Sequence, residues 1–108
     1  MNLDRPAAEL AAELNKALRA AGFGPSLAEL CDQQVLCLAE EVGEAVGEYR
    51  RMTGRARRTG ALESLEAELA DVVITAHSVA SLLGVDLDKA ITEKFKIIFS
   101  RGWKEEHS

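Results

Sequence analysis

The chain has 108 residues, of which 47% are apolar and 29% are charged, and its formal net charge is −5. This length and composition are typical of one globular domain with a modest core, and not of a disordered protein. The acidic balance argues against general nucleic-acid binding, and there is no apolar run of 18 residues that would predict a membrane span.

The first half of the chain predicts two helices. Its opening segment, MNLDRPAAEL, lacks the basic and apolar regions of a secretory signal. Cys31 and Cys37 are six residues apart in one predicted helix, which separates their Cα atoms by roughly 9 Å, too far for a disulfide. Two reduced thiols are therefore expected, which favours a cytoplasmic protein. A helical pattern covers residues 3–21, with Asp4 as a candidate N-cap, Pro6 near the first turn and Gly22 as a stop. The segment SLAE then forms a capping box from Ser26 to Glu29 and begins a helix over residues 26–52.

The second half predicts two more helices. One covers residues 61–83 and ends at Gly84, and the next is capped by Asp86 and continues to residue 99 or 101. No strand pattern, low-complexity segment or second domain is found. The expected fold is therefore all-α, with a single domain over residues 1–108.

An acidic pattern occurs twice, as EEVGEAV in the second predicted helix and as EAELADVV in the third. Helical geometry places Glu41 and Glu44 about 80° and 140° to one side of an apolar stripe on their helix. Glu68 and Asp71 lie about 70° and 130° to the same side of the equivalent stripe. If the two helices pack antiparallel, the four carboxylates converge. The two apolar stripes consist of Val35, Leu38, Val42, Ala45 and Tyr49, and of Leu62, Leu65, Leu69, Val72, Ala76 and Leu83.

Converging carboxylates repel one another unless they are protonated, paired with a base or neutralised by a cation. No Lys or Arg lies three or four residues from any of these four acids, so a divalent cation is the simplest solution. Oxygen ligands alone indicate Mg²⁺, with Mn²⁺ as an alternative. A di-iron site would need Glu-x-x-His motifs, and neither His77 nor His107 follows a Glu at that spacing. In the alternative interpretation the acids only solvate the flanks of the helices.

The segment EEVGE followed after a loop by ELAD resembles the E-E-x-x-E … E-x-x-D signature of the all-α nucleoside triphosphate pyrophosphohydrolases, the MazG-like superfamily. The similarity continues through ADVVITAHSVASLLGVDLDKAITEKF to RGW and covers residues 26–103. It implies a four-to-five-helix bundle completed by dimerisation, or a tetramer of paired dimers. The implied activity is Mg²⁺-dependent conversion of a (d)NTP to (d)NMP and pyrophosphate, as in the clearing of nucleotide pools.

The resemblance also implies residue roles. The acids matching Glu41, Glu44, Glu68 and Asp71 hold the metals, and the acid matching Glu40 orients or deprotonates the attacking water. Lys94 and Arg101 match basic residues that contact substrate phosphates. One departure concerns Ile98, because many members carry Asn at that position. This departure supports an alternative function, a catalytically idle protein that binds nucleotide or metal as a regulator. A structural helical interaction module is a third possibility.

Three further expectations concern surfaces. The apolar stripes exceed what a thin helical hairpin can bury alone, so a homodimer at least is expected. Glu48, one turn beyond Glu44, is interpreted as a surface acid, and His77 as a polar-surface or interface residue. The five arginines between residues 50 and 58 are interpreted as part of a solvated loop, with a phosphate-attracting flap as the alternative.

Overall fold

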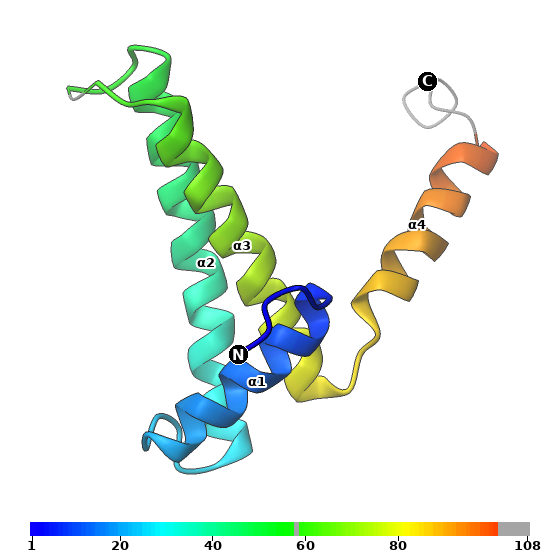
Figure 1. Cartoon of the computed structure of the whole chain (residues 1–108). Helices are drawn as coiled ribbons and strands as arrows, with labels where there is room; N and C mark the ends of the chain where they lie inside the picture. Colours follow the sequence, from blue (N-terminus) through cyan, green and yellow to red (C-terminus); the bar gives the residue numbers. More distant parts are fainter. Residues whose placement is uncertain (58, 102–108) are drawn as a thin grey trace.

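The computed structural model describes residues 1–57 and 59–101. Within these residues the chain forms four helices and no strand: α1 (Ala7–Ala20), α2 (Leu27–Met52), α3 (Leu62–Leu83) and α4 (Leu87–Arg101) (Figure 1). The predicted all-α fold is confirmed. Arg58, Trp103 and His107 lie outside the described residues.

Three of the predicted helix ends are formed by the side chains and glycine that the sequence indicates. The Ser26 hydroxyl oxygen accepts a 3.1 Å hydrogen bond from the backbone N–H of Glu29 and caps α2. Gly84 ends α3 with a φ of 68°, in the left-handed region. Asp86 Oδ1 accepts a 3.1 Å hydrogen bond from the N–H of Lys89 at the start of α4.

The predicted start of the first helix was wrong. Helix α1 begins at Ala7, Pro6 is its N-cap residue in an extended conformation (φ −56°, ψ 145°), and Asp4 lies outside it. The physical reason is steric, because the ring of Pro6 disfavours a helical conformation at the preceding Arg5. The helix therefore cannot extend back across that position.

Helices α2 and α3 pack side by side as an antiparallel hairpin, and α1 packs across the lower part of α3 (Figure 1). The fully or nearly buried apolar side chains are few: Ala11, Leu30, Ala45 and Ala80. Gly24, in the α1–α2 turn, has a φ of +69°, and a Cβ there would meet Leu30 at 2.7 Å. A glycine is therefore required where this turn closes over the buried Leu30.

The hairpin contact buries only part of the two apolar stripes: Ala45 is 8% exposed, and Leu38, Leu65, Val72 and Ala76 are partly buried. Val35, Val42 and Tyr49 remain between 45% and 48% exposed, and Leu62 and Leu69 are more than half exposed. Glu41 and Glu68 are less exposed than these apolar residues. The hairpin therefore packs through a face that includes acidic side chains, and much of its apolar surface faces solvent in the single chain.

The contact between α1 and α3 is rich in polar groups. Asn15 on α1 donates a 3.1 Å hydrogen bond from Nδ2 to the backbone carbonyl of Ser78 on α3. His77 is only 6% exposed and lines a cavity with Ala8 of α1. His77 is therefore an interface residue within the chain and not a surface residue.

Helix α4 stands away from the hairpin and has no extended packing with the other helices (Figure 1). It has no buried residue, and its exposed apolar side chains include Ile91, Phe95, Ile97 and Phe99. The radius of gyration is 16.9 Å, against about 13 Å for a compact domain of this length. The four helices thus do not form a complete bundle within one chain.

None of the helices in residues 1–57 and 59–101 is by itself long and apolar enough to cross a membrane. Helices α3 and α4 reach the required length and hydropathy only when taken together, and they are bent by 108° relative to each other.

Candidate metal centre

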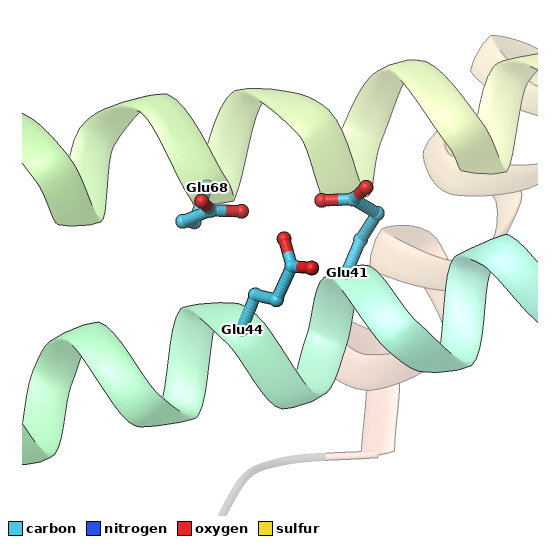
Figure 2. A group of neighbouring side chains, drawn as sticks. All are labelled: Glu41, Glu44 and Glu68. Carbon is cyan, nitrogen blue, oxygen red and sulfur yellow. The ribbon is translucent and has the colours of Figure 1, made fainter.

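Three of the four predicted metal ligands meet between α2 and α3. Glu41 and Glu44 extend from α2 towards α3, and Glu68 extends from α3 towards them (Figure 2). One carboxylate oxygen from each residue lies within 4.8 Å of the others. The predicted convergence of the acidic pairs is thus observed for these three side chains.

The helical spacing explains why these side chains meet. Glu41 and Glu44 are three residues apart, so they lie on neighbouring turns of the same face of α2. Glu68 lies on the face of α3 that packs against α2 in the antiparallel hairpin. The two helices therefore bring carboxylates that are distant in sequence to one position.

Two of the carboxylate oxygens in this cluster are buried without a hydrogen-bond partner among the described residues. They are the Oε2 atoms of Glu41 and Glu68. Buried polar atoms in proteins usually have a partner, so an unpartnered pair on facing helices calls for a bound donor or cation.

The electrostatics of the cluster favour protonation when no cation is bound. Desolvation, followed by hydrogen bonding and charge repulsion from Glu44 and then from Glu41, raises the pKa of Glu68 to about 7. Desolvation also raises the pKa of Glu41, with further contributions from the charges of Glu44 and Asp71. The three carboxylates thus resist simultaneous ionisation.

The fourth predicted ligand, Asp71, lies one turn beyond Glu68 on α3 and is exposed. Its carboxylate is outside the group joined by distances of 4.8 Å or less, although its charge acts on Glu41. Glu40 is exposed on α2, next in sequence to Glu41, and is also outside that group. The assignments of Asp71 as a ligand and of Glu40 as a base stay predictions.

The predicted phosphate-binding residues lie elsewhere. Lys94 and Arg101 are exposed residues of α4, the helix that stands away from the hairpin (Figure 1). Lys94 lines a small apolar cavity of about 150 Å³ with Ile91, Phe95 and Ile98. The single chain therefore does not bring these cations to the acidic cluster. Ile98 shares a face of α4 with Lys94, as the sequence predicts.

The sequence-based interpretation missed one pair beside the cluster. Glu48 is not a free surface acid, because its Oε1 accepts a 2.6 Å hydrogen bond from Nη2 of Arg51 and its side chain is only 18% exposed. Arg50 and Arg51 belong to the last turn of α2 and not to the loop. The spacing of Glu48 and Arg51, three residues apart on a helix, is the signal that could have identified the pair.

Chemically, the cluster is suited to a hard divalent cation. It offers carboxylate oxygens only, two of which are buried and unpartnered, and no described Lys or Arg forms an ion pair with its members. Mg²⁺ and Mn²⁺ prefer such oxygen donors. The residues present therefore fit the metal that the sequence predicts.

The chain matches no protein-family model, no curated protein and no solved structure. The likeness to the pyrophosphohydrolases therefore depends on the two acidic motifs and the segment that follows them. The acidic cluster between α2 and α3 is the structural feature that points most directly to a function.

Proposed function

We propose that the protein is a nucleoside triphosphate pyrophosphohydrolase that requires a divalent cation and converts a (d)NTP to (d)NMP and pyrophosphate. The observation that carries this proposal is the meeting of Glu41, Glu44 and Glu68 between two helices, with two buried oxygens left unpartnered. Three carboxylates this close can all ionise together only when a cation neutralises their charge.

The carboxylates of Glu41, Glu44 and Glu68 would hold the cation, with Asp71 as a further oxygen donor one turn along α3. The ion, when bound, supplies positive charge that offsets the negative charge on the phosphates as the transition state forms. The carboxylates would keep the ion between the helices, and the hairpin holds the carboxylates in place.

Glu40 is the proposed base. It is exposed, and it lies about 40° around the helix from Glu44, so its carboxylate is beside the cluster and open to solvent. There it accepts a proton from the attacking water as the water oxygen bonds to phosphorus and the bond to the leaving pyrophosphate oxygen breaks. General-base assistance of this kind contributes about 10²- to 10⁴-fold in rate.

We further propose that the working form is a homodimer or a tetramer of paired dimers. This proposal is supported by apolar side chains that are exposed to solvent on α4 and on the α2–α3 hairpin. Four of them are between 46% and 54% exposed: Phe95, Ile97, Val46 and Leu69. Exposed apolar surface of this extent indicates association. In an assembly, Lys94 and Arg101 would contact phosphates at a site that they do not reach in the isolated chain.

The second candidate is a catalytically idle protein that binds nucleotide or metal. One observation favours it: Ile98 lies in the apolar cavity beside Lys94, where many members of the family have Asn. In this function the cluster still binds a cation, so metal binding alone does not separate the two candidates.

The deciding experiment is incubation with each common (d)NTP and Mg²⁺, followed by separate measurement of pyrophosphate and orthophosphate. The proposal expects pyrophosphate and the nucleoside monophosphate in equal amounts, and no reaction in the presence of a chelator. No turnover with any nucleotide, combined with stabilisation by Mg²⁺ and nucleotide, would support the idle protein instead.

A further inference from the structure

A polar cavity lies next to the metal centre, at the end of the hairpin where α2 and α3 are connected. It has a volume of about 540 Å³, which is within the range for small-molecule sites. Its lining comes from the end of α2, the connection and the start of α3: Glu48, Arg51, Thr59, Gly60, Ala61 and Ser64.

The cavity is one helical turn from the acidic cluster on both helices. Glu48 follows Glu44 by four residues on α2, and Ser64 precedes Glu68 by four residues on α3. Four residues correspond to about 6 Å along a helix. Arg51 lies between the two regions: its hydrogen bond to Glu48, with a smaller contribution from the charge of Glu68, raises the pKa of its guanidinium. A ligand held at the cluster by its phosphates can therefore extend into the cavity.

The connection is held close to α2 at this point. A Cβ on Gly60 would lie 2.8 Å from Cβ of Arg51 and 3.1 Å from the backbone nitrogen of Met52, so only glycine allows this approach. The close approach places Thr59 and Ala61 in the cavity lining, opposite the end of α2. The cavity is therefore built by the packing of the connection on α2.

The lining is suited to a neutral ligand that carries hydroxyl groups. Glu48 and Arg51 form an ion pair with no net charge, and the hydroxyls of Thr59 and Ser64 form no hydrogen bond with another described residue. The neutral Glu48–Arg51 pair offers no net positive charge to a phosphate. A nucleobase would lack an aromatic or large apolar side chain for stacking, because none lines the cavity.

We propose that this cavity binds the sugar of the nucleotide, with the Glu48 carboxylate accepting hydrogen bonds from the sugar hydroxyls. Arg51 positions that carboxylate through the 2.6 Å hydrogen bond to its Oε1, and Oε2 is left for the ligand. Ser64 and Thr59 supply additional hydroxyl contacts. This assignment rests on the proposed function, and it makes Glu48 a residue that determines selectivity for the sugar.

The test measures binding, so it does not depend on turnover. Calorimetry with Mg²⁺ compares inorganic tripolyphosphate with α,β-methylene analogues of ribo-, deoxyribo- and 2′,3′-dideoxynucleoside triphosphates. The proteins compared are the wild type, Glu48→Gln, Ser64→Ala and the control Glu66→Gln, which removes an exposed carboxylate of α3 that does not line the cavity.

The wild type should bind the hydroxylated nucleotides about 10-fold or more tightly than the dideoxy analogue, since a charge-assisted hydrogen bond is lost with the hydroxyls. Glu48→Gln should remove most of that preference, Ser64→Ala should weaken nucleotide binding about 2- to 10-fold, and Glu66→Gln should change neither. Tripolyphosphate should bind all four proteins equally, because it lacks a sugar.

Two results would overturn the assignment. An unchanged preference for sugar hydroxyls in Glu48→Gln, or an equal loss of tripolyphosphate binding, would show that Glu48 does not contact the sugar. Tripolyphosphate binding without any gain from the nucleoside would reject the sugar site and leave the metal-dependent phosphate site standing. Failure of every phosphate ligand to bind would reject the proposed function together with this site.

Discussion

Glu41 of α2 and Glu68 of α3 each have a buried Oε2 atom without a hydrogen-bond partner among the described residues, on the contacting sides of the same hairpin. The two residues are 27 positions apart in sequence, and only the antiparallel packing of the helices brings them together. A cation would satisfy both oxygens at once, and this relationship leads to the first three predictions.

Divalent cations should stabilise the folded protein. A ligand bound only by the native state contributes about 2.7 kcal/mol when its free concentration is 100-fold above Kd, which raises Tm of a domain of this size by roughly 10–20 °C. Thermal melts with Mn²⁺ or Mg²⁺ and with a chelator measure the shift. Glu68→Gln should remove it, whereas Glu66→Gln should retain it. A wild-type melting temperature that does not change when the cation is added would support a purely structural module.

The metal-free protein should lose stability as the pH rises from about 4.5 to about 7. The pKa of Glu68 is raised from 4.5 in the unfolded chain to about 7 in the folded protein, so the folded state binds more protons in this window. The contribution of Glu68 to the free energy of unfolding is therefore fully present below about pH 4.5 and is lost by about pH 7. Glu41 acts in the same direction, because its pKa is also raised.

This pH dependence is measured by thermal or urea unfolding in a chelator at constant ionic strength, from pH 4.5 to pH 8. The difference in stability between the wild type and Glu68→Gln should change across the window and level off above it. Saturating Mn²⁺ should oppose the loss, since the cation binds the ionised carboxylates. A difference that is constant with pH would contradict the raised pKa.

Glu40 and Glu41 are adjacent in sequence and should respond differently to the same substitution. Glu40→Gln should keep the stabilisation by metal and lower the rate of pyrophosphate release about 10²- to 10⁴-fold, because it removes only the base. Glu41→Gln should lose the stabilisation by metal as well as the rate. Steady-state kinetics at saturating metal and parallel melts measure both properties. If the two variants fail in the same way, the assigned roles are wrong.

The isolated chain should associate through its open apolar faces. Sedimentation velocity is expected to give a dimer or a tetramer. Phe95→Asp should shift the species towards monomer, because Phe95 is 52% exposed on α4 and stacks with Phe99 at a centroid distance of 5.9 Å. Thr92→Asp is the matched control, because it introduces the same charge at an exposed position of α4 that does not line the apolar cavity containing Phe95. A wild type that is monomeric at all concentrations would reject the oligomer.

Leu30 should be the most sensitive apolar position. Its side chain is fully buried beneath the turn that contains Gly24, and truncation to Ala should cost about 2–5 kcal/mol through lost transfer energy and a cavity. Leu36→Ala, on the same helix at 66% exposure, should cost less than about 1 kcal/mol. Urea denaturation of both variants gives the comparison, and equal losses would show that Leu30 is not a core anchor.

Local signals in the sequence were sufficient to predict the helices and part of the acidic cluster. Three helix ends are formed by the residues that the sequence indicates: Ser26, Gly84 and Asp86. The three-residue spacing of Glu41 and Glu44 directs both side chains towards α3. These features depend on residues within one or two turns of each other. Propensity and periodicity therefore determine them before any tertiary contact is known.

Tertiary features were harder to predict. Helical periodicity placed His77 away from the acids but could not indicate that α1 covers it. It also could not reveal that α4 stands apart, because an amphipathic face shows that a helix needs a partner and not where the partner is. The Glu48–Arg51 pair was overlooked because a helical ion pair usually lies on an open surface.

The attachment of α1 to α3 has a dynamic consequence. Ala11 and Asn15 are the buried residues of α1. The contact includes the Asn15–Ser78 hydrogen bond, and buried atoms of Asn15, His77 and Ser78 have no hydrogen-bond partner among the described residues. Because α1 buries only one apolar residue, we expect it to open as a cooperative unit while the hairpin stays folded. In hydrogen–deuterium exchange, the amides of α1 would then become labelled well before those in the middle of α2 and α3.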